Sequence, residues 1–133
     1  MSKKDQPKYV DAFVLVVPKD KVEAYREMAR EGGEMWMKHG ALAYRECMGD
    51  DLNPEMGGGM EGLRFPQMTK ADSNETVWFS YIEFESKEHR DLVNKKVMAE
   101  MEEKYKDHPD AMQNMPFDMK KMAYGGFTAE VSF

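Results

Sequence analysis

Asp11 is the residue best suited to acid–base chemistry, because it is a carboxylate in the middle of an otherwise apolar run. Burial removes the hydration of a carboxylate, raises its pKa and makes it a candidate general base. Tyr44 and Glu46 lie two residues apart, so in a strand they share one face and offer a hydroxyl and a second carboxyl. Two facing carboxyl groups push their pKa values apart, which leaves one of them neutral and able to donate a hydrogen bond.

These groups are predicted to converge on an apolar cavity, which is the usual form of a small-molecule site. Asp118 is included because it stands beside a turn before the last predicted strand and can reach the mouth of the cavity. Alternatively, the polar groups hydrogen-bond to one another or across a dimer, and only satisfy buried polar atoms. The candidate cavity-lining residues are Asp11, Tyr44, Glu46, Ser80, Trp78 and Asp118, beside Phe13, Ile82 and Thr128.

The other reactive side chains favour structural roles, so no catalytic residue is assigned. Cys47 has the opposite strand parity, and we expect it to face the helices as an inert buried thiol. His39, His89 and His108 show neither i, i+4 pairing nor a short ligand spacing, which argues against a zinc site. No histidine lies inside a predicted strand, which disfavours haem. We therefore expect no metal and no cofactor.

Composition excludes several classes of protein. The 133 residues are 41% hydrophobic and 33% charged, which is typical of one folded domain over residues 1–133 rather than a disordered chain. With 25 acidic against 19 basic residues and a net charge of −6, a nucleic-acid partner is not expected. No apolar run reaches the roughly 18 residues of a membrane span, and the polar first residues do not resemble a signal peptide. The single cysteine fits a reducing cytosol.

The periodicity of the chain predicts the elements that must position these residues. β-Branched and aromatic runs predict strands, and apolar residues at steps of three and four predict helices. The predicted order is βαββαβ, the ferredoxin-like unit of an α+β fold. The expected elements are strands over 8–17, 41–48, 75–85 and 122–133, helices from about 20 to 39 and from 86 to 104, and a short turn or helix after Pro109.

Local signals mark the two helices. Asp20 with Glu23 has the spacing of a capping box, and Ser86 is the predicted N-cap of the second helix. Gly32 and Gly33 lie inside the first helix, where each costs on the order of 1 kcal/mol relative to alanine. The glycine pair indicates either a close approach between helix and sheet or a kink.

The connection over residues 50–74 is unusually long for a compact domain, so it is either functional or mobile. Its Gly57-Gly58-Gly59 tract lacks the strand-to-helix context and the Lys-Ser/Thr pair of a phosphate loop, and indicates flexibility. We expect weak hydrogen-exchange protection here, except where the apolar residues Leu63, Phe65 and Pro66 pin the far half of the loop to the body or to a partner.

Both faces of the predicted sheet are apolar, whereas two helices cover only one. In the first strand, Val10 and Val14 point one way and Asp11 and Phe13 the other. A second copy of the same sheet is the simplest cover for the open face, because homo-oligomers usually close by twofold symmetry. We assign the candidate cavity to this open face, and expect a homodimer held mainly by Phe13, Trp78 and Ile82.

Several segments together resemble the DUF1428 family, a group of small bacterial proteins of unknown function. The resemblance covers nearly the whole chain, and departs in residues 56–62, which are more glycine-rich than expected there. It implies a dimeric α/β-barrel fold in which two ferredoxin-like sheets pack face to face, and it implies no activity. The segments that carry it are Tyr9-Val10-Asp11, Tyr44-Arg45-Glu46-Cys47 with Gly49-Asp50-Asp51, His89-Arg90-Asp91 with Val93-Asn94 and Val97-Met98, and, most specific, Met115-Pro116-Phe117-Asp118 with Met122 and Gly125-Gly126-Phe127.

Three functions stay open at this point. The first is a small cytosolic homodimer that binds a small molecule in the barrel cavity. The second is a cofactor-free enzyme, monooxygenase-like or isomerase-like, for which fold analogy is the only support. The third is a structural or regulatory dimer without chemistry, whose cavity is filled by side chains. Neither a membrane nor a nucleic acid is an expected partner.

Overall fold

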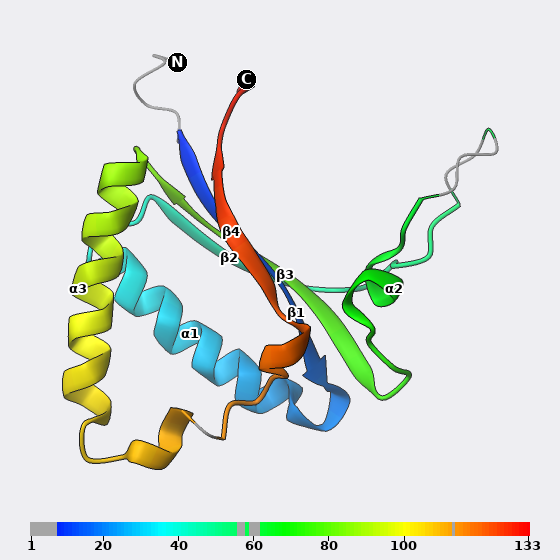
Figure 1. The fold of residues 1–133 in the computed structure, drawn as a ribbon, viewed down its shortest axis with the longest axis horizontal. Helices are drawn as coiled ribbons and strands as arrows, with labels where there is room; N and C mark the ends of the chain where they lie inside the picture. The colour runs from blue at the N-terminus through cyan, green and yellow to red at the C-terminus, as the bar shows by residue number, and fades with distance from the viewer. Residues whose placement is uncertain (1–7, 56–57, 59–61, 113) are drawn as a thin grey trace.

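The computed structural model describes residues 8–55, 58, 62–112 and 114–133, and shows a four-stranded antiparallel sheet with two long helices (Figure 1). The sheet order is β2-β3-β1-β4, which confirms the predicted ferredoxin-like α+β fold. The elements are β1 (Tyr9–Pro18), η2 (Lys19–Lys21), α1 (Val22–Lys38), β2 (Ala43–Met48), α2 (Phe65–Thr69), β3 (Glu75–Phe84), α3 (Lys87–Tyr105), η3 (Pro109–Met112), η4 (Met119–Lys121) and β4 (Ala123–Thr128).

Of the two predicted helix starts, the structure confirms one and contradicts the other. Ser86 caps α3 as expected, because its hydroxyl accepts a hydrogen bond from the His89 backbone N–H at 3.0 Å. The capping box at Asp20 is wrong. A 3-10 turn, η2, leads directly into α1, the N-cap position falls on Lys21 without a side-chain bond, and Glu23 pairs with Arg26 instead.

The last strand is shorter than predicted. β4 ends at Thr128, which pairs with Tyr9, the first residue of β1. Residues beyond Thr128 have no residue of β1 opposite them, because β1 begins at Tyr9. Their apolar side chains therefore do not extend the strand. Val131 and Phe133 are exposed as a result.

The glycine pair of α1 makes room for an aromatic side chain and does not break the helix. α1 runs without interruption from Val22 to Lys38. A Cβ atom on Gly33 would lie 2.9 Å from Cδ1 of Tyr44, and one on Gly32 would lie 3.2 Å from the Tyr44 hydroxyl oxygen. Of the two predicted readings, the close approach is therefore the one observed.

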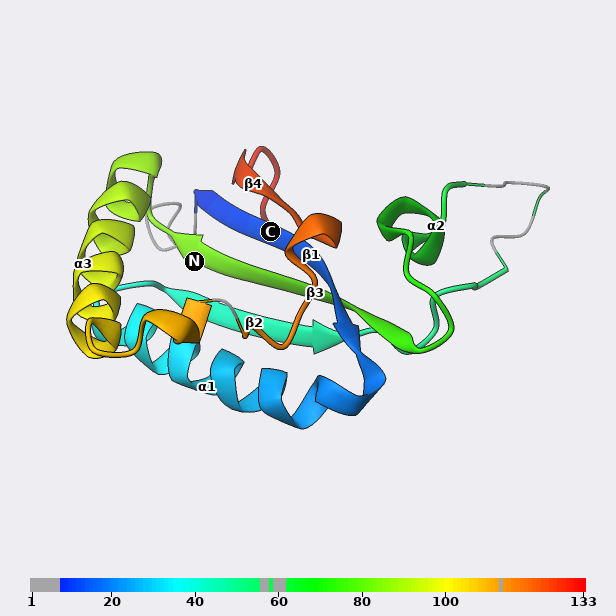
Figure 2. The ribbon, with the colours of Figure 1, turned by 60° about the horizontal axis from the view of Figure 1, so that its bottom comes forward.

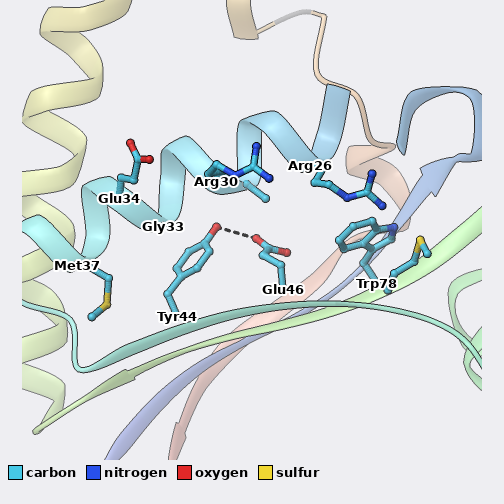
Figure 3. A pocket seen from close by; sticks show the side chains of 10 residues that line it. Arg26, Arg30, Gly33, Glu34, Met37, Tyr44, Glu46 and Trp78 are labelled. Carbon is cyan, nitrogen blue, oxygen red and sulfur yellow. Dashed lines mark hydrogen bonds between the residues drawn. The ribbon is translucent and has the colours of Figure 1, made fainter. Parts of the chain in front are cut away.

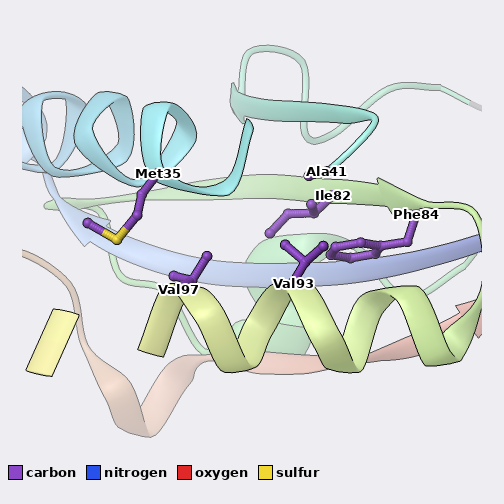
Figure 4. Close-up of a cluster of buried hydrophobic side chains, with 6 residues drawn as sticks. All are labelled: Met35, Ala41, Ile82, Phe84, Val93 and Val97. Atoms are coloured by element: carbon purple, nitrogen blue, oxygen red, sulfur yellow. The ribbon is translucent and has the colours of Figure 1, made fainter. Parts of the chain in front are cut away.

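α1 and α3 cover one face of the sheet, and the core lies between them and that face (Figures 1 and 2). In one cluster, Val93 and Val97 of α3 pack against Ile82 and Phe84 of β3 (Figure 4). The second cluster lies under the other half of α1 and consists of Leu15, Val17, Tyr25, Ala29 and Trp78, with Phe117 and Met122 packed against it.

The predicted assignment of the two faces is wrong. Asp11, Phe13, Tyr44, Glu46, Trp78, Ser80 and Ile82 were expected on the open face, but they lie on the face that the helices cover. Phe13, Trp78 and Ile82 contribute to the two core clusters, so they are not available to hold a dimer. Strand parity identifies which residues share a face, and only packing decides which face the helices cover.

The open face carries the other parity, including Val10, Val14, Phe79 and Phe127. Phe79 and Phe127 are 42% and 59% exposed. Cys47, paired with Phe79 across β2 and β3, is also exposed, so the expectation that it is buried against the helices is wrong.

The far half of the long connection contacts the body as predicted. α2, which includes Phe65 and Pro66, contacts β1 and β3 at the end of the sheet remote from α3 (Figure 2). Leu63, the third predicted anchor, is 73% exposed and does not take part. Gly57 and Gly59 of the glycine tract lie outside the described residues.

None of the helices in the described part of the chain is both long enough and apolar enough to span a lipid bilayer.

Candidate functional site

A groove lies between α1 and β2 (Figure 3). Its volume is about 640 Å³, which lies in the range of small-molecule sites. One wall comes from α1 and the other from the helix-covered face of the sheet. The lining residues are Arg26, Ala29, Arg30, Gly33, Glu34, Met37, Tyr44, Glu46, Met48 and Trp78.

Glu46 is the polar centre of this groove. The Tyr25 hydroxyl of α1 donates a hydrogen bond to Oε1 of Glu46 at 2.8 Å. The Tyr44 hydroxyl, two residues away on β2, donates to Oε2 at 2.7 Å (Figure 3). Ser80 is a third hydrogen-bond partner of this carboxylate. A carboxylate accepts about four hydrogen bonds, so Glu46 keeps acceptor capacity for a further donor.

Burial shifts the titration of all three groups. It raises the pKa of Glu46, and the hydrogen bonds from Tyr44, Tyr25 and Ser80 offset part of the rise. Burial and the nearby Glu46 carboxylate raise the pKa of Tyr25 and of Tyr44 well above the ordinary tyrosine value. The two tyrosines therefore remain neutral donors at any physiological pH, and Glu46 is the one group of the three that can exchange its proton.

The α1 wall brings two arginines to the groove. Arg26 and Arg30 are one helical turn apart, and each contacts a glutamate three residues before it, Glu23 or Glu27. In both pairs a single Nη1 atom contacts the glutamate, so further N–H donors of each guanidinium remain for an acceptor. The groove therefore offers a carboxylate on the sheet side and guanidinium groups on the helix side.

Asp11 lies elsewhere on the same sheet face and has a charged partner. Arg90 Nη1 of α3 donates to Asp11 Oδ1 at 2.6 Å, and its guanidinium stacks over the Tyr9 ring at 5.0 Å. Asp11 is 6% exposed. Burial raises its pKa, and the Arg90 charge and a hydrogen bond from Asn94 offset part of the rise. Asp11 is not among the groove-lining residues.

The predicted site residues thus divide into two groups. Tyr44, Glu46 and Trp78 line one groove. Ser80 is buried on the same face, and Asp118 accepts a hydrogen bond from the Lys120 backbone N–H at 3.0 Å as the N-cap of η4. Neither Ser80 nor Asp118 lines the groove, and Asp11 is held by Arg90 away from it.

Sequence reasoning missed the contribution of α1. Tyr25 lies on the apolar stripe of the helix, so the periodicity of the sequence gives no sign that its hydroxyl is a partner for a carboxylate. Arg26 and Arg30 flank that stripe at i, i+4 spacing, which was a usable signal because such a pair projects from one helix face. Nothing in the sequence around Arg90 predicts its pairing with Asp11, because the two residues are far apart along the chain.

The described residues contain no group of three or more His, Cys, Asp or Glu side chains placed to hold a metal ion. Two of the histidines have hydrogen-bond partners. His39 Nε2 lies 2.7 Å from Glu100 Oε1, and His89 Nδ1 accepts a hydrogen bond from the Glu85 backbone N–H.

Comparison with known proteins identifies the family. The model of a protein family of unknown function, DUF1428, matches residues 8–119. The chain belongs to the DUF1428 family. Another match is the uncharacterized protein YbaA of Escherichia coli K12, 44% identical over 120 residues that cover 90% of this chain and 94% of YbaA. The uncharacterized protein YbaA of Shigella flexneri matches equally well.

Among solved structures, a dimeric ferredoxin-like protein from an uncultured marine organism shares this DUF1428 chain's fold. Its TM-score is 0.56 at 9% sequence identity, and the match covers 96% of this chain and all of that one, 100%. At this identity the likeness concerns the fold alone.

Proposed function

We propose that this DUF1428 protein binds a small organic molecule in the groove between α1 and β2. The observation that carries the proposal is the environment of Glu46. Its carboxylate lines the groove, and its hydrogen-bond partners, the side chains of Tyr25, Tyr44 and Ser80, are all neutral hydroxyls. A half-buried carboxylate without a cation retains capacity for a ligand, and Trp78, Met37 and Met48 supply apolar surface around it.

The methionines of the chain allow a direct test by methyl NMR. Met37 and Met48 line the groove, whereas Met98 and Met119 are exposed elsewhere. During titration with a panel of small carboxylic acids, amines and phenols, we expect saturable shifts of the Met37 and Met48 methyl signals with at least one compound. The Met98 and Met119 signals serve as internal controls and stay in place. Uniform shifts, or none over the whole panel, would contradict binding in the groove and favour a dimer without a ligand.

We propose further that the protein is a homodimer formed through the open face of the sheet. Support comes from the exposed aromatic side chains Phe79 and Phe127 on that face, and from the dimer named for the marine ferredoxin-like protein. Exposed apolar patches on a sheet commonly mark interfaces.

Light scattering after gel filtration should give twice the chain mass of 15.4 kDa. The variant Phe79→Lys with Phe127→Lys should give the single mass, and a wild-type monomer at micromolar concentration would refute the proposal.

A cytosolic location is part of the same proposal. Cys47 is the single cysteine of the chain and is exposed, and exposed free thiols persist in reducing compartments. Fractionation of a bacterium that makes the protein tests this location, and recovery with the periplasmic fraction would contradict it.

A further inference from the structure

Glu46 combines three properties that a general base requires. It lines an open groove, its carboxylate keeps acceptor capacity beyond the hydrogen bonds from Tyr25, Tyr44 and Ser80, and none of the ion pairs among the described residues includes it. A base paired with a guanidinium would be too weak to take a proton from carbon, whereas neutral hydroxyl donors only orient it. Burial, which raises the pKa of Glu46, adds to its basicity.

The groups that face Glu46 define what it can act on. α1 presents Tyr25, Arg26, Arg30 and Glu34, β2 presents Tyr44, and β3 presents the non-ionisable Ser80 and Trp78. The arginines are the cationic groups in this set, and a guanidinium binds a carboxylate in a planar, bidentate manner.

The opposing polarity of the two walls suits a ligand of a particular kind. The carboxylate of the ligand would meet Arg26 or Arg30, and an acidic C–H group would meet Glu46 on the sheet. Trp78, Met37 and Met48 would contact an aromatic or aliphatic substituent. A 2-oxo acid is the simplest compound that carries a carboxylate, a carbonyl-activated methylene and such a substituent.

We infer that Glu46 is the general base for keto–enol tautomerisation of a bound 2-oxo acid with an apolar substituent, an inference that rests on the proposed binding of small molecules in the groove. Glu46 takes a proton from the methylene carbon, and the electron pair of that C–H bond forms the C=C bond. The carbonyl π pair moves to oxygen, where a guanidinium stabilises the developing negative charge. A solvent water protonates that oxygen to give the enol, and the hydroxide so formed takes the proton back from Glu46, so the reaction is an isomerisation without oxidant or reductant.

Tyr25 and Tyr44 act as positioning residues in this reaction. Each hydroxyl donates a hydrogen bond to one carboxylate oxygen, and the two bonds together fix the orientation of the carboxylate. Loss of one hydroxyl removes a donor to the charged form, so the pKa of Glu46 rises further. A purely structural tyrosine would not move the pH dependence of the rate.

Phenylpyruvate is the probe for the test, because it carries the carboxylate, the acidic methylene and an aromatic ring. Exchange of its methylene protons in D₂O is followed by ¹H NMR with the full chain. We expect acceleration by about a hundredfold over buffer, in the range of general base catalysis. Glu46→Gln should return the rate to that of buffer, and Glu102→Gln, which removes an exposed carboxylate on α3, should keep it.

Two further variants separate the positioning role of Tyr44 from the ligand-binding role of Arg30. Tyr44→Phe should move the pH midpoint of the rate upward, and Arg30→Gln should raise the half-saturating concentration of phenylpyruvate without moving that midpoint. Tyr44→Phe retains the carboxylate, so it tests the inference even where Glu46→Gln lowers the stability of the fold.

The inference and the proposed function fail in different ways. Phenylpyruvate that shifts the Met37 and Met48 methyl signals, but exchanges no faster with wild type than with Glu46→Gln between about pH 5 and pH 9, overturns the inference and leaves the groove as a binding site. An unchanged pH midpoint in an active Tyr44→Phe overturns the positioning role. A failure of every compound to move those methyl signals overturns the binding proposal itself.

Discussion

Asp11 and Glu46 are both carboxylates on the helix-covered face of the sheet, and their partners differ in kind. Asp11 receives a charged hydrogen bond from Arg90 and lies outside the groove. Glu46 receives neutral hydrogen bonds from Tyr25, Tyr44 and Ser80 and faces the groove. Burial raises the pKa of both carboxyl groups, so that shift alone does not tell them apart.

The difference shows why a buried charge by itself is a weak indicator of function. A carboxylate with a guanidinium partner has its charge compensated inside the fold, and removal of the partner leaves an isolated buried ion. A carboxylate held by hydroxyls is oriented but not neutralised, and its remaining capacity is directed to the groove. We therefore expect a structural role for Asp11, and Glu46 is the residue to test for chemistry.

The largest expected effect on stability comes from the pair of Asp11 and Arg90. Arg90→Met keeps most of the side-chain volume but leaves Asp11 buried without a cation, and should lower the free energy of unfolding by about 3 kcal/mol. Urea denaturation measures it. Asp11→Leu with Arg90→Met should recover most of the loss, because no charge is then unpaired. Arg30→Met, which breaks an exposed pair, is the matched control and should cost less than about 1 kcal/mol. Equal losses for Arg90→Met and Arg30→Met would show that Asp11 does not depend on Arg90.

A smaller effect is expected where α1 meets Tyr44. Gly33→Ala places a Cβ atom 2.9 Å from the Tyr44 ring, close to the backbone, where the ring cannot move freely. The clash should cost roughly 2 kcal/mol, against a gain of about 1 kcal/mol in helix propensity, so the variant is less stable overall. In a Tyr44→Ala background the clash is absent, and the same substitution should stabilise the protein by about 1 kcal/mol. An unchanged sign in the two backgrounds would mean that Gly33 is not required by Tyr44.

The smallest effect concerns pH and the Glu46 carboxyl. Burial raises its pKa in the folded state above the unfolded value, so the associated stability is fully present below the unfolded pKa. That stability is lost as the pH rises through the folded pKa. Wild type should therefore lose stability relative to Glu46→Gln as the pH rises above the ordinary glutamate pKa of about 4.3, as urea midpoints would show, whereas the contribution of Asp11 is common to both proteins and cancels. A difference that stays constant as the pH rises would contradict a raised pKa at Glu46.

The local pattern of the chain was sufficient for the order of its elements. Alternation predicted β1 and β3 almost to the residue, and Ser86 predicted the start of α3, because these signals depend on neighbours within a few positions. Gly32 and Gly33 indicated a close approach within α1, and Tyr44 with Glu46 was correctly placed on one strand face. Each of these features is decided by residues close together in sequence.

The side of the sheet on which the helices lie was decided only in the tertiary structure. Both strand faces are apolar, so parity grouped Asp11 with Phe13 but gave no indication of what covers them. The absent capping box at Asp20 shows that the sequence also did not define closely the junction between β1 and α1. The partners that separate Asp11 from Glu46 come from α3 and α1, distant in the chain. Amino-acid types and spacing thus determined which carboxylates are buried, and the packing of the helices alone determined that one meets a cation and the other a groove.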